Sequence, residues 1–410
     1  MNKFKEIFRA LKYRNFKLFF PGIAISQIGI WIQNVAISWF VYEITKSPLI
    51  MGTVMFFNSI PLFLITPFAG VIADKFDRQK ILLAVQILYV VQAFIITILS
   101  FFDWLRIWNI IILGVFLNTL AAIDAPLRQS TFVLVVDDKK DLGNAISLNS
   151  SCFNMARLIG PAIAGFIIAK FNLTICFLAN LLCLIPIIFL VKMMKINDKK
   201  DERIKNESIW EGLKEGFEYV FKTPQIKTLI MYLGTYCFMI MIYPMLLPIY
   251  TKEVLHANAD ILGYLLSAAG IGSLITSLLL AIKKTTRNLR KLIFSGLFLA
   301  CTCFIAMGFV NSFPIAMILM FIVGLGSPLV FTSENMLLQF CIDDNKRGRV
   351  MSINALAFWG TTSISSLFAG SVAHITGISN SFIILGGLMF LIGCIYSLKL
   401  SKLNFIKEKI

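Results

Sequence analysis

The composition of the 410-residue chain is that of a membrane protein. Hydrophobic residues make up 58% of the chain, charged residues make up only 15%, and the mean hydropathy is +0.81. A soluble globule of this length needs more polar side chains to cover its surface, so that class is excluded. The net charge of +16 comes from basic residues spread among the loops rather than gathered on one face, so we expect no nucleic-acid partner.

Twelve apolar runs each reach the roughly 20 residues that a helix needs to cross a bilayer. Six runs precede a polar segment and six follow it, which predicts an all-α membrane protein with twelve transmembrane helices in two six-helix bundles. The expected domains are a first bundle over 1–191, a linker over 192–224 and a second bundle over 225–410. The runs cover 16–42, 49–73, 81–101, 105–126, 143–169, 173–191, 225–250, 261–282, 289–310, 314–333, 350–375 and 379–400.

The distribution of basic residues predicts the orientation. With the loops assigned alternately, 33 of the 38 Lys and Arg residues fall on the side that holds both termini, four fall on the other side, and Arg157 lies within a span. Cytoplasmic loops carry the excess of Lys and Arg, so both termini are expected in the cytoplasm.

The linker contains one periodic stretch. Trp210, Leu213, Phe217 and Phe221 recur at intervals of three and four residues with charged residues between them, which predicts an amphipathic helix on the cytoplasmic face. A tether between the bundles and a regulatory or partner-binding role both remain open for it.

The turn GVIADKFDRQK, residues 70–80, joins the second and third runs and carries Gly70, Asp74, Arg78 and Lys80 at fixed offsets. It resembles the loop signature between spans two and three of the major facilitator superfamily. That resemblance implies a conformational gate: Gly70 allows close approach, and Asp74 meets the helix that starts near Gly348 when the cavity opens outward. Arg128, Arg78 and Lys80 belong to the same gate, and Arg128 can pair with Asp74.

Four further segments resemble one branch of that superfamily, the drug:proton antiporters that include enterobactin and macrolide exporters. They are DAPLRQS at 124–130, ARLIGPAIAG at 156–165, EGLKEGFEYVFKTPQIKTLI at 211–230 and KRGRVMS at 346–352. The resemblance implies a secondary transporter in a bacterial cytoplasmic membrane that exports an amphipathic small molecule, such as a drug or a siderophore, in exchange for protons.

Glycines in the fifth span point to close helix contact. Gly160 and Gly165 let another helix approach, and Pro161 removes a backbone donor and can kink the span. Ordinary helix packing and a role in the conformational switch both remain open. Sliding the chain by 205 residues places Gly165 on Gly370, so span five is echoed in span eleven, as expected for a fold with two related halves.

Polar stripes on three spans predict a central cavity. A charge inside a membrane is costly unless it faces a cavity or a partner, which makes Arg157 the strongest candidate for binding an anionic or phenolic group. A structural hydrogen bond is the alternative. The other predicted cavity residues recur at helical spacing and are Gln27, Trp31, Asn34, Asn154, Tyr232 and Tyr236.

No acidic residue lies at the centre of a predicted span. The candidate proton carriers therefore lie near span ends: Glu43 at an outer end, and Asp124 and Glu334 near inner ends. Asp124 is favoured among them.

The chain lacks the signatures of other classes. It has no phosphate-binding Gly-x-x-x-x-Gly-Lys, its two histidines are isolated, and its eight cysteines show no paired ligand spacing, so we expect no enzyme activity, cofactor or metal. The expected partners are a small-molecule substrate, protons and the bilayer, and the expected state is a monomer. Alternative functions are a lysophospholipid or lipid translocator and a membrane sensor that moves no substrate.

Overall fold

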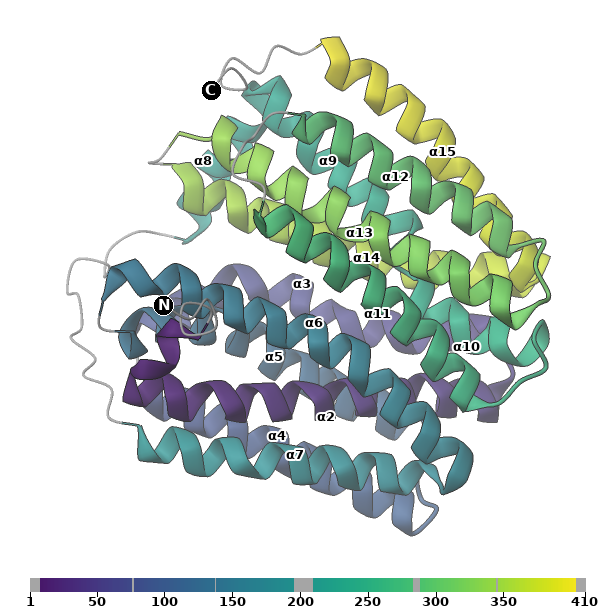
Figure 1. Ribbon diagram of the computed structural model, residues 1–410, viewed down its shortest axis with the longest axis horizontal. Coiled ribbons are helices and arrows are strands. Elements are labelled where there is room, and N and C mark those ends of the chain that lie inside the picture. The colour runs from purple at the N-terminus through teal and green to yellow at the C-terminus, as the bar shows by residue number, and fades with distance from the viewer. Residues whose placement is uncertain are drawn as a thin grey trace.

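The computed structural model is helical and describes residues 8–75, 77–136, 138–194, 209–282, 288–343 and 346–402. Figure 1 shows the helices as a bundle of long, roughly aligned rods. In chain order the elements are η1 (Arg9–Lys12), α2 (Arg14–Thr45), α3 (Pro48–Lys75), α4 (Arg78–Phe101), α5 (Ile107–Val135), α6 (Lys139–Lys170), α7 (Leu173–Met193), α8 (Ile209–Lys222), α9 (Pro224–Met239), α10 (Tyr243–Glu253), α11 (Ala259–Ile282), α12 (Leu289–Met307), α13 (Phe313–Cys341), α14 (Arg347–Thr376) and α15 (Ile378–Lys402).

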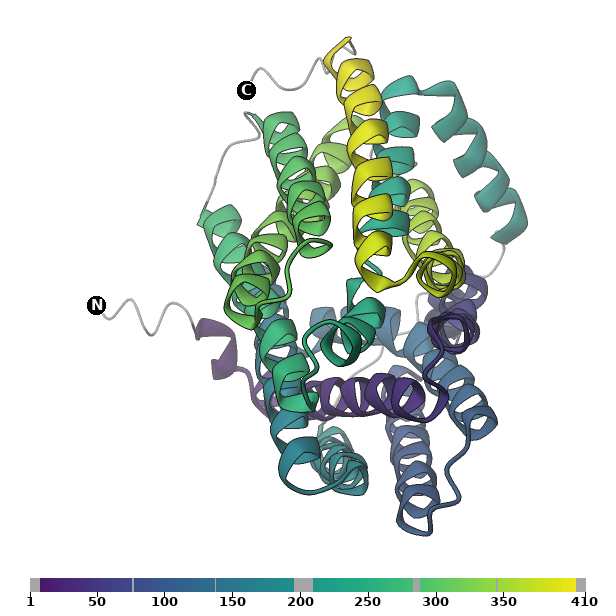
Figure 2. The ribbon, with the colours of Figure 1, turned by 90° about the vertical axis from the view of Figure 1, so that its right-hand side faces the viewer.

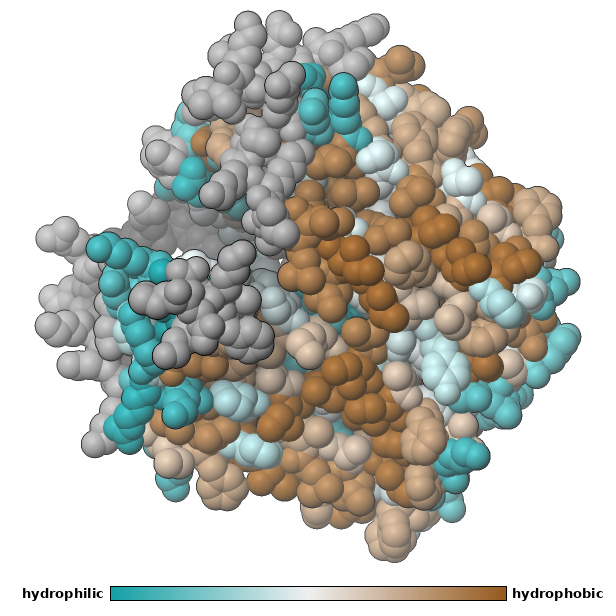
Figure 3. Space-filling model, in the orientation of Figure 1, coloured by the Kyte–Doolittle hydropathy of each residue, from teal (hydrophilic) through white to brown (hydrophobic). Residues whose placement is uncertain are grey.

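The helices form a membrane protein. Within the described residues, eleven segments are long and apolar enough to cross a bilayer, with α9 and α10 counted together as one. Helix α14, the predicted eleventh span, has 30 residues but is not among those eleven. Its hydropathy is lowered by Asn, Ser and Thr residues, several of which are buried against other helices. Figure 3 shows apolar residues across the middle of one face and hydrophilic residues gathered at its right-hand end.

The predicted seventh span is not one continuous helix. It consists of α9 and α10, separated by residues 240–242, and the amide of Tyr243 donates to the carbonyl of Ile240 at 3.2 Å. Pro244 follows directly and has no amide hydrogen to continue the helical ladder. The predicted span over 225–250 is confirmed as one membrane-crossing segment, but it consists of two helices.

Two groups of helices make up the molecule. In Figure 1, α2 to α7 occupy the lower part and α9 to α15 the upper part, and Figure 2 looks along the same helices from one end. We call the end that carries η1 and α8, on the left of Figure 1, the linker end, and the opposite end the far end.

Glycines bring the two groups together near the far end. A Cβ atom on Gly165 of α6 would lie 2.6 Å from the carbonyl oxygen of Ala259 and 3.0 Å from the Cα of Gly263, both in α11. A Cβ on Gly370 of α14 would lie 2.9 Å from the Cα of Gly52 in α3. Only glycine allows backbones to approach this closely, so α6 packs on α11 and α3 on α14.

Candidate functional site

A cavity of about 920 Å³ lies between the two groups of helices. Helices α2, α5 and α6 line one side of it, and α11 and α13 line the other. The lining residues come from the last turns of α5, α11 and α13 and from the first half of α6, which are the parts nearest the linker end. The two groups are thus packed together near the far end and separated by the cavity toward the linker end.

The chemistry of the lining is amphipathic and cationic. Among the described lining residues, Arg128 and Arg157 are the charged side chains, and no carboxylate accompanies them in the wall. The polar remainder consists of amides and hydroxyls, namely Gln27, Gln129, Ser147, Asn149, Ser150, Ser151, Asn154, Ser277, Ser327 and Thr332. Apolar surface comes from Phe132, Phe153, Leu274, Phe331 and Met336, among others. A molecule that combines an anionic group with apolar surface would be complementary to this wall.

Arg157 links the two groups of helices. It lies half-buried in α6, and its Nη2 donates a hydrogen bond of 2.5 Å to the hydroxyl of Tyr243, the first residue of α10. A guanidinium has five N–H donors, so this bond leaves others for a ligand. The alternative role for Arg157, a structural hydrogen bond, stays open, because the bond to Tyr243 is itself a contact of this kind. The nearby Asn154 amide donates to the carbonyl of Ser150.

Arg128 forms a buried ion pair within α5. Its Nε lies 2.6 Å from Oδ2 of Asp124, and the two side chains are 8% and 7% exposed. The amide of Gln86 in α4 donates to the other carboxylate oxygen at 3.0 Å. Nη1 of Arg128 is buried and has no hydrogen-bond partner among the described residues. The predicted partner of Arg128 was Asp74, whose side chain lies outside the described residues.

The structure brings together part of the predicted cavity. Gln27, Asn154 and Arg157 line it, whereas Trp31 and Asn34 do not. The Trp31 ring lies 6.1 Å from the Phe153 ring, between centroids, and its Cβ is 2.5 Å from where a Cβ on Gly160 would lie. Trp31 thus supports the cavity wall from behind.

Two predicted cavity tyrosines lie elsewhere. Tyr232 is fully buried and donates to the carbonyl of Ile293 in α12 at 3.3 Å, and Tyr236 is fully buried with its hydroxyl 3.4 Å from Oγ of Ser327. These two tyrosines of the span-seven stripe pack inside the second group of helices. Their assignment to the cavity is corrected accordingly. Tyr236 contacts a lining residue without lining the cavity itself.

The remaining candidate acids differ in their surroundings. Glu43 lies at the far end of α2, with its carboxylate 2.9 Å from Nζ of Lys252 and 3.2 Å from Nζ of Lys46. Tyr42 beside it donates to Glu253 of α10. Glu334 of α13 is 1% exposed and forms no ion pair with any described residue.

The predicted gate is only partly described. Gly70 lies within α3, whereas the Asp74 side chain lies outside the described residues. Asp77 caps the start of α4, where its carboxylate accepts from the amide of Lys80 at 3.0 Å. Among the described residues, no atom lies within 4 Å of where a Cβ on Gly348, in the first turn of α14, would be.

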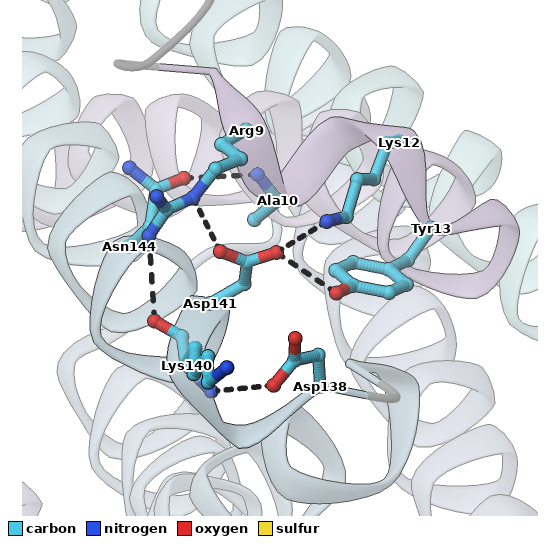
Figure 4. A network of polar contacts seen from close by, with 8 residues as sticks. All are labelled: Arg9, Ala10, Lys12, Tyr13, Asp138, Lys140, Asp141 and Asn144. Atoms are coloured by element: carbon cyan, nitrogen blue, oxygen red, sulfur yellow. Dashed lines mark hydrogen bonds and ion pairs between the residues drawn. The ribbon is translucent and has the colours of Figure 1, made fainter.

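A polar network at the linker end fixes the first turn of α6 and is shown in Figure 4. Asp141 accepts from the Tyr13 hydroxyl at 2.8 Å and lies 2.6 Å from Nζ of Lys12, and it also pairs with Arg9. Hydrogen bonding to Asp141 raises the pKa of Lys12. Because α6 carries Arg157, this network holds one cavity wall to η1. Sequence reasoning missed it, since the partners are more than 120 residues apart.

The amphipathic helix α8 is attached to the second group. Glu215 pairs with Lys346 at 2.9 Å and with Arg349, and the Tyr219 hydroxyl donates to Asp343 at 3.0 Å. Its Phe217 and Phe221 are exposed, which suits a helix that lies at a membrane surface.

Comparison with known proteins identifies the chain's relatives. The sequence pattern of the family described as transmembrane secretion effector matches residues 7–409. The staphyloferrin A transporter of Staphylococcus aureus is 28% identical, with 90% of this chain and 92% of the relative covered. The multidrug efflux pump Tap of Mycolicibacterium fortuitum is 23% identical over 90% and 91% of the two chains. Macrolide efflux protein A of Streptococcus pyogenes is 21% identical over 94% and 96%.

Solved structures share the fold. A variant of the nucleoside transporter NupG superposes with a TM-score of 0.75 at 10% identity, covering 93% of this chain and 98% of that one. A bacterial homologue of the human lysosomal transporter Spinster gives 0.73 at 12% identity, covering 95% and 97%. At these identities the likeness concerns the fold alone.

Proposed function

Because the chain belongs to the transmembrane secretion effector family of the major facilitator superfamily, we propose that it is a proton-coupled exporter of an anionic amphipathic small molecule. The observation that carries this proposal is the cavity with Arg157 and Arg128 in its wall and apolar side chains around them. The chain is a multi-pass membrane protein and not an enzyme, so the cavity serves binding and passage rather than chemistry.

The orientation follows from charge. Lys and Arg are concentrated in the loops at the linker end, which we assign to the cytoplasm. The cavity then opens toward the cytoplasm while glycine contacts close the far end, which is the state in which an exporter loads its substrate. Alternating access requires these contacts to separate and the linker end to close. The division at residues 191 and 225 into two bundles that rock against each other is part of this proposal.

The two arginines would determine the class of substrate. Arg157 and Arg128 face one cavity, so their potentials add there, and a cation would be repelled by both. Asp124 neutralises most of the charge of Arg128, which leaves Arg157 as the stronger anion-binding group. Its planar fork favours a carboxylate or another flat anionic group.

The relatives support export of this kind. One is named a staphyloferrin A transporter and two are named for drug or macrolide efflux, which agrees with the predicted range from siderophore to drug. A lipid translocator is the second candidate function. It is supported by the exposed aromatic residues of α8, which suit a helix that lies against lipid. A membrane sensor that transports no substrate is the third candidate function.

Everted membrane vesicles test the proposal. Vesicles with the wild-type chain, with Arg157→Gln and with empty membranes are energised and given an extract of the host's small metabolites, and the trapped compounds are analysed by mass spectrometry. We expect wild-type vesicles to accumulate acidic amphipathic compounds and to release protons as they do so. The Arg157→Gln vesicles should lose that accumulation at equal expression.

Arg14→Gln is the matched control, because Arg14 is an exposed arginine at the linker end and its loss should leave accumulation unchanged. Accumulation of lysophospholipid alone would favour the translocator, and no accumulation with any extract would favour the sensor. Accumulation of cations by the wild type, unaffected by Arg157→Gln, would contradict the assignment of the arginines.

A further inference from the structure

Glu334 is a buried acidic residue that does not line the cavity. It lies in the last two turns of α13, its side chain is 1% exposed, and Oε1 is buried with no hydrogen-bond donor among the described residues. The side chain of Asn354 in α14 forms a hydrogen bond with this carboxyl group, and Oδ1 of that amide is buried without a described donor. Two buried acceptors that lack donors destabilise the fold unless a hydrogen is supplied.

A proton on the carboxyl supplies that hydrogen. A protonated carboxyl group has one O–H donor, which can satisfy an acceptor such as Oδ1 of Asn354. The ionised form would bury a negative charge with no described cation beside it and only the Asn354 amide to stabilise it, which is costly. The group facing it from α9 is the thiol of Cys237, and in the described parts of α11, α12 and α14 no charged side chain faces it.

The other candidate acids have cations that Glu334 lacks. Asp124 is paired with Arg128, so protonating it would leave a buried guanidinium without its counter-charge. Glu43 is paired with Lys252 and Lys46 at the far end. This reverses the preference for Asp124 that the sequence suggested, because position along a span does not reveal which acid has a partner.

We infer that Glu334 is the proton-carrying residue of the transport cycle. The inference rests on the proposed function. In this state, with the cavity open at the linker end, the carboxyl group of Glu334 is buried from solvent and holds its proton. Thr332 and Met336 line the cavity. Glu334 is two residues from each of them and therefore lies on the opposite face of α13, so a substrate that shifts α13 changes the packing around the carboxyl and can admit water to it. The carboxyl then releases H⁺ to water on the cytoplasmic side and remains as a carboxylate until the opposite state reloads it.

Infrared spectroscopy of the purified full-length protein tests proton binding directly. The carbonyl stretch of a protonated carboxyl group is followed as pH rises in the wild type, in Glu334→Gln and in Asp103→Asn, which removes an exposed acid. We expect a protonated-carboxyl band at neutral pH in the wild type and in Asp103→Asn, and its loss in Glu334→Gln. A band of equal intensity in Glu334→Gln would overturn the inference.

A second measurement uses proteoliposomes and the compound that wild-type vesicles accumulate. Glu334→Gln mimics the protonated state, so it should still exchange labelled for unlabelled compound but lose the acceleration by an inward proton gradient. Glu334→Asp keeps a carboxyl and should restore part of that acceleration. If Glu334→Gln keeps the full response to the gradient, the inference fails. A wild type that moves nothing would instead refute the proposed function, while the infrared result would still stand.

Discussion

Replacing Asp124 by Asn should destabilise the protein strongly. The substitution removes the charge 2.6 Å from Nε of Arg128 and leaves a guanidinium that is 8% exposed without its partner. Removing one member of a buried pair typically costs about 3 to 5 kcal/mol. Arg128 also lines the cavity, where water can reach part of it, so we expect a loss near the lower end, about 3 kcal/mol.

The double variant Asp124→Leu with Arg128→Met should recover most of that loss, because replacing both charges by apolar groups of similar volume is often neutral. Unfolding in mixed detergent micelles, followed by tryptophan fluorescence, gives the free energies. Asp103→Asn, which removes an exposed acid, is the control. A double variant as unstable as Asp124→Asn, or an Asp124→Asn protein as stable as the wild type, would refute the reasoning.

Two further predictions concern the far end and α8. Gly165→Leu should force α6 away from α11 and lower the free energy of unfolding by about 1 to 3 kcal/mol. Gly143→Leu, at a position with no described neighbour within 4 Å, should not lower it, and equal effects would contradict the close packing. The hydrogen bond with Lys346, and after it the charge of Arg349, lower the pKa of Glu215. The contact of α8 with α14 is therefore present at neutral pH and is lost as pH falls through that lowered pKa. Hydrogen-exchange protection of α8 should fall at neutral pH in Glu215→Gln, and only at acidic pH in the wild type. Glu218→Gln is the control, and unchanged protection in Glu215→Gln would contradict this prediction.

The long apolar runs made the fold predictable. Their number, their division by a polar segment and the turn at residues 70–80 predicted an all-helical transporter of the major facilitator superfamily, and the family match confirms that assignment. The break before Tyr243 was missed, because a hydropathy pattern is the same for one long helix and for two short ones. Pro244 was the local signal that could have shown it.

The site was less predictable because helical spacing fixes a face but not what that face meets. Gln27 and the stripe through Asn154 and Arg157 line the cavity, whereas Trp31 and Asn34, on the face of Gln27, do not. Tyr232, on an equally regular stripe, packs against α12. The pair of Asp124 and Arg128 was missed although the two residues are four positions apart, a spacing that places them on one helical face.

The central claim is that one cavity, open to the cytoplasm, holds the exported anion. It is tested most directly by a single cysteine at Ser150, an exposed cavity residue, in a chain whose eight native cysteines have been replaced. A membrane-impermeant maleimide should label Ser150→Cys rapidly in everted vesicles and slowly in intact cells, and the anionic compound that vesicles accumulate should slow the labelling. Asn311→Cys, in a loop at the far end, should show the opposite preference. Rapid labelling of Ser150→Cys from outside only, with no protection by the compound, would contradict the account.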